Sequence, residues 1–263
     1  MKTLLYSSKI QMSIFLLLIF ITTFFYTSYS SQFIVFLIVL FSAIVSDLIF
    51  AKIRKIEYFF PSAAIVSALI ITLLINPQIE LYKAGGIAIL AMFFKNFLRV
   101  SNRHIFNPAA LGLLLGAVIF NEGVTWWGVS WQQLSIFNFP ASLRGEPSSI
   151  FFLILLSPLL VSVIRMKRYR ITISFLVIYG IINQIFNFQL SIFNSILDPT
   201  VLFFSLVMLP EPMTSPNNHT RQILFGAFVA IMSFIISLPL FSFMPDVFIV
   251  ALLIGNMVFF KLR

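Results

Sequence analysis

The segment RHIFNPAALG, which begins at Arg103, places ionisable side chains and an Asn-Pro step between two strongly apolar runs. Asn107 can cap the free N–H groups of a helix that starts at Pro108, where the proline ring fixes φ without wasting a donor. Such a helix end attracts anionic or carbonyl-bearing ligands. The candidate binding residues are therefore Arg103, His104, Asn107, Pro108 and Ala109. A capped membrane helix that packs through its small residues explains the same pattern without a ligand, and the residues alone favour that simpler interpretation.

A second polar segment, LPEPMTSPNNHTR, begins at Leu209 and holds three prolines within seven residues, which excludes a regular helix there. Apolar runs on both sides leave little room for an ordinary loop, so a re-entrant or site-forming turn competes with a polar cytoplasmic loop. Glu211 is a candidate for a proton or cation site, because the prolines should leave backbone carbonyls free around it. Thr214 and Ser215 add hydroxyl groups to the same candidate ion pathway.

Two further carboxylates lie in or beside apolar runs. Asp47, in AIVSDLIFAKIRK, is about one helical turn from a basic segment. Acids inside membranes are costly, which makes Asp47 a third ion-pathway candidate, although pairing with Lys52 or Arg54 would explain it equally well. Asp198 directly precedes Pro199 and is expected to cap a helix.

Composition sets the class of protein. Of the 263 residues, 60% are hydrophobic and 10% are charged, which predicts a polytopic α-helical membrane protein. The absence of cysteine excludes disulfides, a cysteine-ligated iron–sulfur cluster and a thiolate nucleophile within this chain. With only two histidines, no haem held by two histidines is expected. The net charge of +9 would suit a nucleic-acid partner, but the cations fall in short loops, so the lipid bilayer is the expected partner and nucleic acid is not.

Ten apolar runs predict about ten transmembrane helices in one domain, residues 1–263: helices 1–5 over about 10–120, an outer loop at 121–149, and helices 6–10 over about 149–260. With the N-terminus in the cytoplasm, only Lys83 and Arg144 of the 17 Lys and Arg residues fall outside. This strong positive-inside bias predicts cytoplasmic N- and C-termini. The first apolar run is expected to be a retained helix rather than a cleaved signal peptide. The ten runs have these approximate bounds: 10–28, 31–50, 58–76, 83–98, 106–120, 149–165, 171–187, 198–209, 222–239 and 243–260.

Two of these runs, Pro108 to Phe120 and Pro199 to Leu209, are too short to cross a bilayer. At about 1.5 Å per residue they cover roughly 20 Å or less of a core about 30 Å thick. Broken helices of this kind hold ligands in transporters built from inverted repeats, and five helices on each side of the outer loop suggest such a 5+5 repeat. A tilted helix explains the short runs equally well, and no clear residue match links the two halves.

The ordered pair HIFNPAALG and, about a hundred residues later, PEPMTSPNNHTRQILFG resembles the NqrB/RnfD family. This family comprises membrane components of the Rnf electron-transport complex and of the sodium-pumping NADH:quinone oxidoreductase. Its patterns run approximately F-N-P-A-x-x-G and D-P-x-[TS]-x-P/S, and the similarity covers most of residues 83–230. Glu211 stands where the family has Asp, a chemically tolerable difference.

The resemblance implies a ten-helix, multi-pass protein of the bacterial plasma (inner) membrane. It implies partner subunits of an electron-transport complex and electron flow coupled to movement of a small cation, Na+ or H+. A riboflavin-type flavin is expected at the turn of Asn107, Pro108 and Ala109, with Arg103 and His104 as neighbours.

Family members usually carry a second flavin, an FMN joined to a Thr in an S-G-A-T motif. Here the corresponding stretch reads TWWGVSWQQLS, in which Gly128, Val129 and Ser130 match the beginning and Gln133 offers no hydroxyl. The sequence therefore predicts no covalent FMN and leaves riboflavin or FMN bound non-covalently. It also keeps two alternatives open: a non-redox channel or transporter for a small polar solute, and a structural subunit whose flavin site has decayed.

Overall fold

The computed structural model describes residues 8–24, 31–56, 60–100, 103–130, 148–186 and 192–262. Helices make up almost all of its regular structure, which confirms an all-α protein of membrane type. One small exception is an antiparallel pair of two-residue strands that pairs Arg99 with His104. The elements before the outer loop are α2 (Ser8–Thr23), α3 (Ser31–Ile53), α4 (Ser62–Leu74), α5 (Leu81–Phe97), β1 (Arg99–Val100), β2 (Arg103–His104), α6 (Pro108–Phe120) and α7 (Trp127–Ser130).

The elements that follow are α8 (Ser148–Arg165), α9 (Tyr169–Phe186), α10 (Ile192–Leu197), α11 (Pro199–Phe203), the π-helix η2 (Phe204–Met208), α12 (His219–Ser237), the 3-10 helix η3 (Pro239–Phe241), α13 (Val247–Val258) and the 3-10 helix η4 (Phe260–Leu262). Each of the ten predicted apolar runs overlaps a helix. Within the described ranges, α3, α9 and α12 are long and apolar enough to cross a membrane. Ten crossings, the repeat and the cytoplasmic termini stay predictions.

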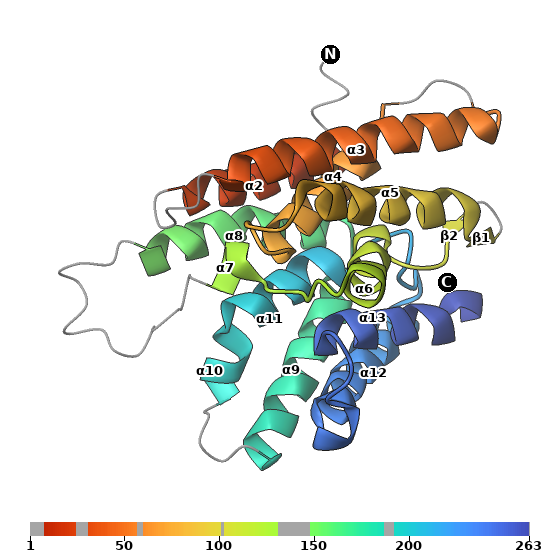
Figure 1. Cartoon of the computed structure of the whole chain (residues 1–263). Coiled ribbons are helices and arrows are strands. Elements are labelled where there is room, and N and C mark those ends of the chain that lie inside the picture. Colours follow the sequence, from red (N-terminus) through yellow and green to blue (C-terminus); the bar gives the residue numbers. More distant parts are fainter. Residues whose placement is uncertain are drawn as a thin grey trace.

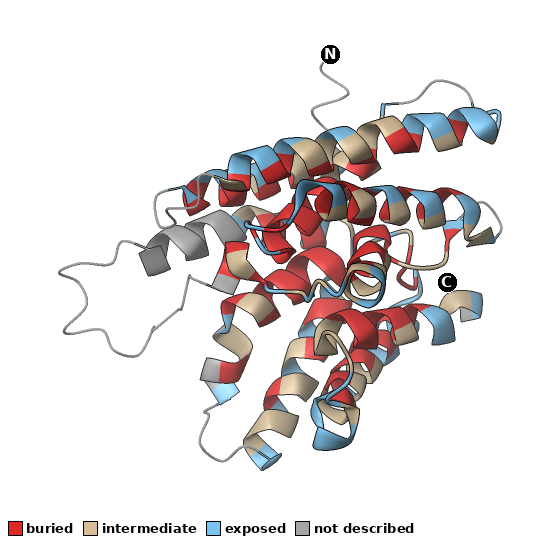
Figure 2. Ribbon diagram, viewed as in Figure 1, coloured by how far each residue is buried: buried red, intermediate tan, exposed pale blue. Residues whose placement is uncertain are grey.

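The helices form two layers around a central group (Figure 1). Helices α2, α3 and α5 lie on one side, α9, α12 and α13 on the other, and the short helices α4, α6 and α11 lie between them. Figure 2 shows the buried residues concentrated in this central group. Large apolar side chains are exposed on the outer helices, among them Phe41 at 68% on α3 and Ile173 at 55% on α9. Exposed apolar faces around a buried centre suit a protein surrounded by lipid.

Both short helices begin as their sequences predict. The Asn107 side chain accepts a hydrogen bond from the N–H of Ala110 at 3.1 Å, and Pro108 is the first residue of α6. Asp198 accepts from the N–H groups of Thr200 at 2.9 Å and Val201 at 3.1 Å at the start of α11. These caps satisfy donors that have no partner within the helix.

The second short helix is not a regular α-helix. After five α-helical residues it widens into the π-helix η2, in which the N–H of Leu209 donates to the carbonyl of Phe204 at 3.0 Å. Single π-helical turns are rare and often occur at functional sites. Here the π-helix leads directly into the proline-rich turn that carries Glu211.

Candidate functional site

The two polar segments singled out in the sequence meet in space. The Asn107 Nδ2 donates to the carbonyl of Met208 at 3.3 Å, which joins the start of α6 to the end of η2. The His104 Nε2 lies 3.1 Å from the Glu211 Oε1. This second contact is an ion pair when His104 is protonated and a hydrogen bond when it is neutral. Residues about a hundred positions apart therefore form one cluster.

The proline-rich turn is closed by its own side chains. The Thr214 hydroxyl donates to the Glu211 Oε2 at 3.0 Å, and the Ser215 hydroxyl donates to the Glu211 backbone carbonyl at 2.7 Å. The N–H of Ser215 donates to the same carbonyl at 3.0 Å. The carbonyl of Glu211 is therefore used within the turn, and the expectation that other backbone carbonyls around Glu211 are free stays a prediction.

Asn256, within the apolar helix α13, links both segments. In the amide orientation that satisfies its neighbours, it donates to the carbonyl of Thr214 at 3.1 Å and accepts from the N–H of Asn107 at 3.3 Å. Its side chain is fully buried. A buried amide with partners on both sides holds them at a set distance, because breaking either bond leaves a polar group without a partner.

Two arginines flank the turn. Arg168, in the link between α8 and α9, is buried, and its Nη2 donates to the carbonyl of Pro212 at 3.5 Å and to the side chain of Asn217. Burial lowers the pKa of the Arg168 guanidinium, and the positive charge of Arg103 lowers it further. Arg103 is exposed and lies next to His104 on β2. The side of the cluster towards the α8–α9 link is therefore positively charged.

A cavity of about 210 Å³ opens beside this cluster. Its polar lining includes His104, Asn107 and Glu211, which sequence analysis had selected, and Lys9 and Ser67, which it had not. Most of its wall is apolar and includes three thioethers. The remaining lining residues are Met12, Ala63, Val66, Ile70, Pro108, Met166, Val207, Pro212 and Met213. An apolar pocket with a few convergent polar groups is the usual form of a small-molecule site.

The lining suits a flat ring with one polar edge, such as the ring of a flavin. Methionine sulfur contacts aromatic faces favourably, and Met12, Met166 and Met213 come from three different parts of the chain. His104 and Asn107 also line the cavity, and their ring and amide groups can donate or accept hydrogen bonds. The volume is below the roughly 300–1,000 Å³ of pockets that enclose a drug-sized ligand, so the cavity matches part of a flavin rather than all of it.

Asp47 does not line this cavity but lies in a buried ion pair between α3 and α5. The Lys95 Nζ is 2.7 Å from the Asp47 Oδ2, and the Asn96 Nδ2 donates to the Oδ1 at 2.8 Å. Asp47 is fully buried and Lys95 is 8% exposed. The partner is therefore Lys95 rather than Lys52 or Arg54, since the side chain points into the helix pair and not along its own helix.

Several residues of the site were not predicted from the sequence. Lys9 is one of many cations in short loops, and the three methionines resemble ordinary core residues. Asn256 carried the one usable signal, because an amide within the run ALLIGNMVFF is a polar group in an otherwise apolar helix.

The outer segment that replaces S-G-A-T is described only at its start. Gly128 of α7 packs against α4, and a Cβ at that position would lie 2.5 Å from the Cδ2 of Leu73. Trp131, Gln132 and Gln133 fall outside the described residues. The absence of a covalent FMN stays a prediction.

Comparison with known proteins identifies the chain at the level of a family. A search of curated proteins gave no match. The family profile, in contrast, matches almost the whole chain and includes both polar segments of the site. The profile aligns with residues 4–261, and the chain belongs to the NQR2, RnfD, RnfE family.

Proposed function

We propose that the protein is the flavin-binding membrane subunit of an ion-translocating electron-transport complex. Its family is linked to such complexes, which consist of several subunits, so the chain has membrane partner subunits. The observation that supports flavin binding is the convergence of His104, Asn107 and Glu211 on one methionine-lined cavity.

In this proposal His104 and Asn107 would hold the polar edge of a non-covalently bound riboflavin or FMN. The thioethers of Met12, Met166 and Met213 would contact its ring. A flavin supplies one- and two-electron transfer. Lys9, which is exposed and lines the cavity, would contact a flavin that binds there, and the cavity of about 210 Å³ would hold only part of it. Pro108 and Ala109, both buried, hold the start of α6 in place beside Asn107.

We propose that Glu211 carries the coupling ion, and that a proton suits the arrangement better than Na+. Both carboxylate oxygens of Glu211 already have partners, His104 and Thr214, and its carbonyl accepts from Ser215. A hard metal cation requires several free oxygen ligands. A carboxylate beside a histidine can instead take up or release a proton through their shared hydrogen bond. Asp47 is the second candidate for the ion pathway, because it is a buried acid among apolar helices.

Flavin binding can be tested at Asn107. Asn107→Ala is expected to weaken riboflavin binding at least about tenfold, since the carbonyl of Met208 loses its partner at a cost of about 1–3 kcal/mol and the edge of the cavity relaxes. Fluorescence titration of the purified protein with riboflavin and with FMN measures the effect. Asn107→Asp keeps the oxygen that caps α6 but loses the N–H group that donates to the carbonyl of Met208. This variant therefore distinguishes the loss of the bond to Met208 from the loss of the helix cap.

The matched control is Asn183→Ala, which removes an amide that donates to its own helix α9 at Tyr179. This variant should bind flavin as the parent does. Purified protein without flavin absorbance and without riboflavin binding would contradict the redox proposal. In that case uptake of urea, ammonium or riboflavin by liposomes holding the protein would support the second candidate, a transporter for a small polar solute, which the small cavity volume favours.

The ion role of Glu211 can be tested separately from flavin chemistry. Glu211→Gln is expected to lower the number of ions moved per electron at least about tenfold, because an amide cannot exchange a proton. Glu211→Asp should restore most of this ratio. The measurement is ion movement and electron transfer by the whole complex in the same proteoliposomes. Glu122→Gln, in a partly exposed pair with Lys83, serves as control. An unchanged ratio in Glu211→Gln removes Glu211 from the ion pathway.

A further inference from the structure

The π-helix η2 leaves one backbone carbonyl without its usual donor. The carbonyl of Ser205 would accept from the N–H of Leu209 in an α-helix and from the N–H of residue 210 in a longer π-helix. Here the N–H of Leu209 donates to Phe204 at 3.0 Å, and residue 210 is a proline, which has no N–H. Ser205 is fully buried, and a buried carbonyl without a donor is costly.

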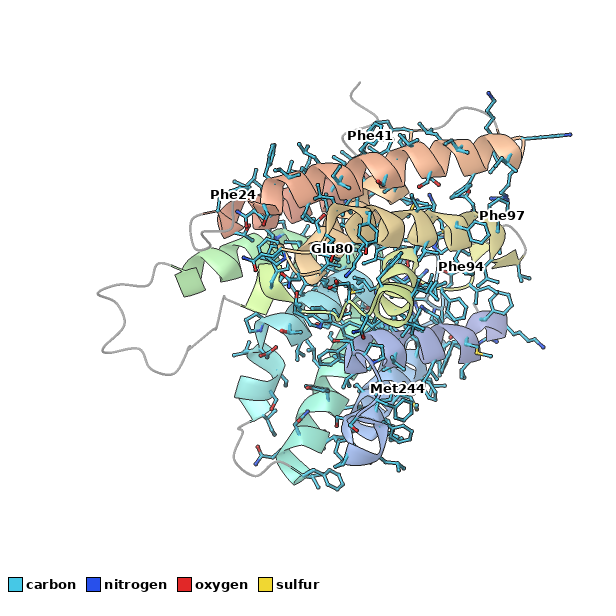
Figure 3. All side chains as sticks on the ribbon, viewed as in Figure 1. Phe24, Phe41, Glu80, Phe94, Phe97 and Met244 are labelled. Atoms are coloured by element: carbon cyan, nitrogen blue, oxygen red, sulfur yellow. The ribbon has the colours of Figure 1, made fainter. Side chains whose placement is uncertain are left out.

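A side chain of another helix supplies this donor. The Thr172 hydroxyl, on α9, donates to the Ser205 carbonyl at 2.8 Å, and Thr172 is only 4% exposed. About one helical turn further along α9, Phe175 packs against Phe204, with ring centroids 5.3 Å apart. Side chains fill the space between the central helices and the layer that contains α9 (Figure 3). Helix α9 therefore contacts η2 through both a hydrogen bond and a buried ring pair.

The register of η2 sets the direction of the proline-rich turn. The Met208 carbonyl, at the end of η2, accepts from Asn107, and Glu211 follows three residues later. The Glu211 Oε1 lies 3.1 Å from the His104 Nε2. If η2 became α-helical, the Ser205 carbonyl would regain a backbone donor, and the residues that follow would rotate by about 100°, the angle between neighbours in an α-helix. A rotation of this size would take Glu211 away from His104.

We propose that Thr172 is a positioning residue for Glu211. Its hydroxyl replaces the backbone donor that Pro210 lacks, and so stabilises the π-helical register of η2. In this way a side chain of α9 keeps Glu211 beside His104. The functional consequence rests on the proposed ion role of Glu211, whereas the hydrogen bond itself does not.

The role of the hydrogen bond can be tested by denaturant unfolding of the full chain in detergent. Thr172→Val is expected to lower the folding equilibrium constant about tenfold, because the Ser205 carbonyl loses its donor. Thr172→Ser keeps a hydroxyl and should lose little. Pro210→Ala adds an N–H where a longer π-helix would use one, so in this background Thr172→Val should have almost no effect. A role of Thr172 in packing alone would not depend on residue 210.

The positioning of Glu211 can be tested by the number of ions moved per electron, measured for the whole complex in proteoliposomes. Thr172→Val should lose most of this ratio, while Thr172→Ser and the double variant Thr172→Val/Pro210→Ala should keep it. The matched control is Thr72→Val. Thr72 is 1% exposed, and its hydroxyl donates to the carbonyl of Ala68 in its own helix α4 at 2.9 Å. This variant should keep the ratio of the parent.

Three outcomes would overturn the inference. An equal loss of stability in Thr172→Val with proline and with alanine at position 210 would show that the hydroxyl does not replace a backbone donor. If Glu211→Gln lowers the ratio and Thr172→Val does not, Thr172 does not position Glu211, and the proposed function stands. If Glu211→Gln leaves the ratio unchanged, the proposed ion role fails, and the positioning role of Thr172 fails with it.

Discussion

Replacement of Asp47 by alanine is expected to lower the free energy of unfolding by about 3–5 kcal/mol. The reason is the charge that is left behind rather than the contact that is lost. Lys95, 8% exposed, then has no carboxylate partner, and the Asn96 amide keeps only the carbonyl of Met92 as an acceptor. In a chain of this length the change corresponds to a fall in melting temperature of about 10 °C.

Thermal unfolding of the purified protein in detergent measures this effect. The double variant Asp47→Ala/Lys95→Met should recover most of the stability, because an apolar replacement of a buried pair is often close to neutral. It also keeps the test open if the single variant does not fold. Glu122→Gln, in the more exposed pair with Lys83, should change stability by less than about 1 kcal/mol. A single variant as stable as the parent would show that the buried pair contributes little.

Replacement of Gly226 by alanine is expected to destabilise the protein by about 3 kcal/mol. Gly226 lies where α12 crosses α9, and a Cβ there would overlap the Ser174 hydroxyl and the backbone carbonyl of Ile171. It would also lie 3.1 Å from the N–H nitrogen of Phe175. Backbone atoms cannot move aside as a flexible side chain can, so the two helices must separate. The gain in helix propensity, about 1 kcal/mol, does not offset this cost.

The control for this prediction is Gly123→Ala, since a Cβ at that position has no neighbour within 4 Å. It should leave the melting temperature unchanged or raise it slightly. The same thermal unfolding measurement serves both variants. If Gly226→Ala proves as stable as Gly123→Ala, the close crossing of α9 and α12 is not what holds this layer together.

The helices and their caps could be predicted from the sequence because each depends on residues close together in the chain. Apolar runs predicted the helices, since a helix satisfies its own backbone within lipid. The caps at Asn107 and Asp198 followed from residue type, because each bond spans only two or three residues. The π-helix η2 and the short strands β1 and β2 were not predicted, since neither has a distinct hydrophobic period.

The pairing between distant segments was decided by tertiary structure. Sequence singled out Asp47 but not Lys95, which lies 48 positions away, and it singled out Glu211 and His104 without placing them in contact. Composition and motif order therefore determined the class of protein, the positions of its helices and its family. Packing of the helices determined which polar groups meet. A buried charge or amide bonds to whichever polar atom lies within about 3 Å of it, even when that atom is far away in the sequence.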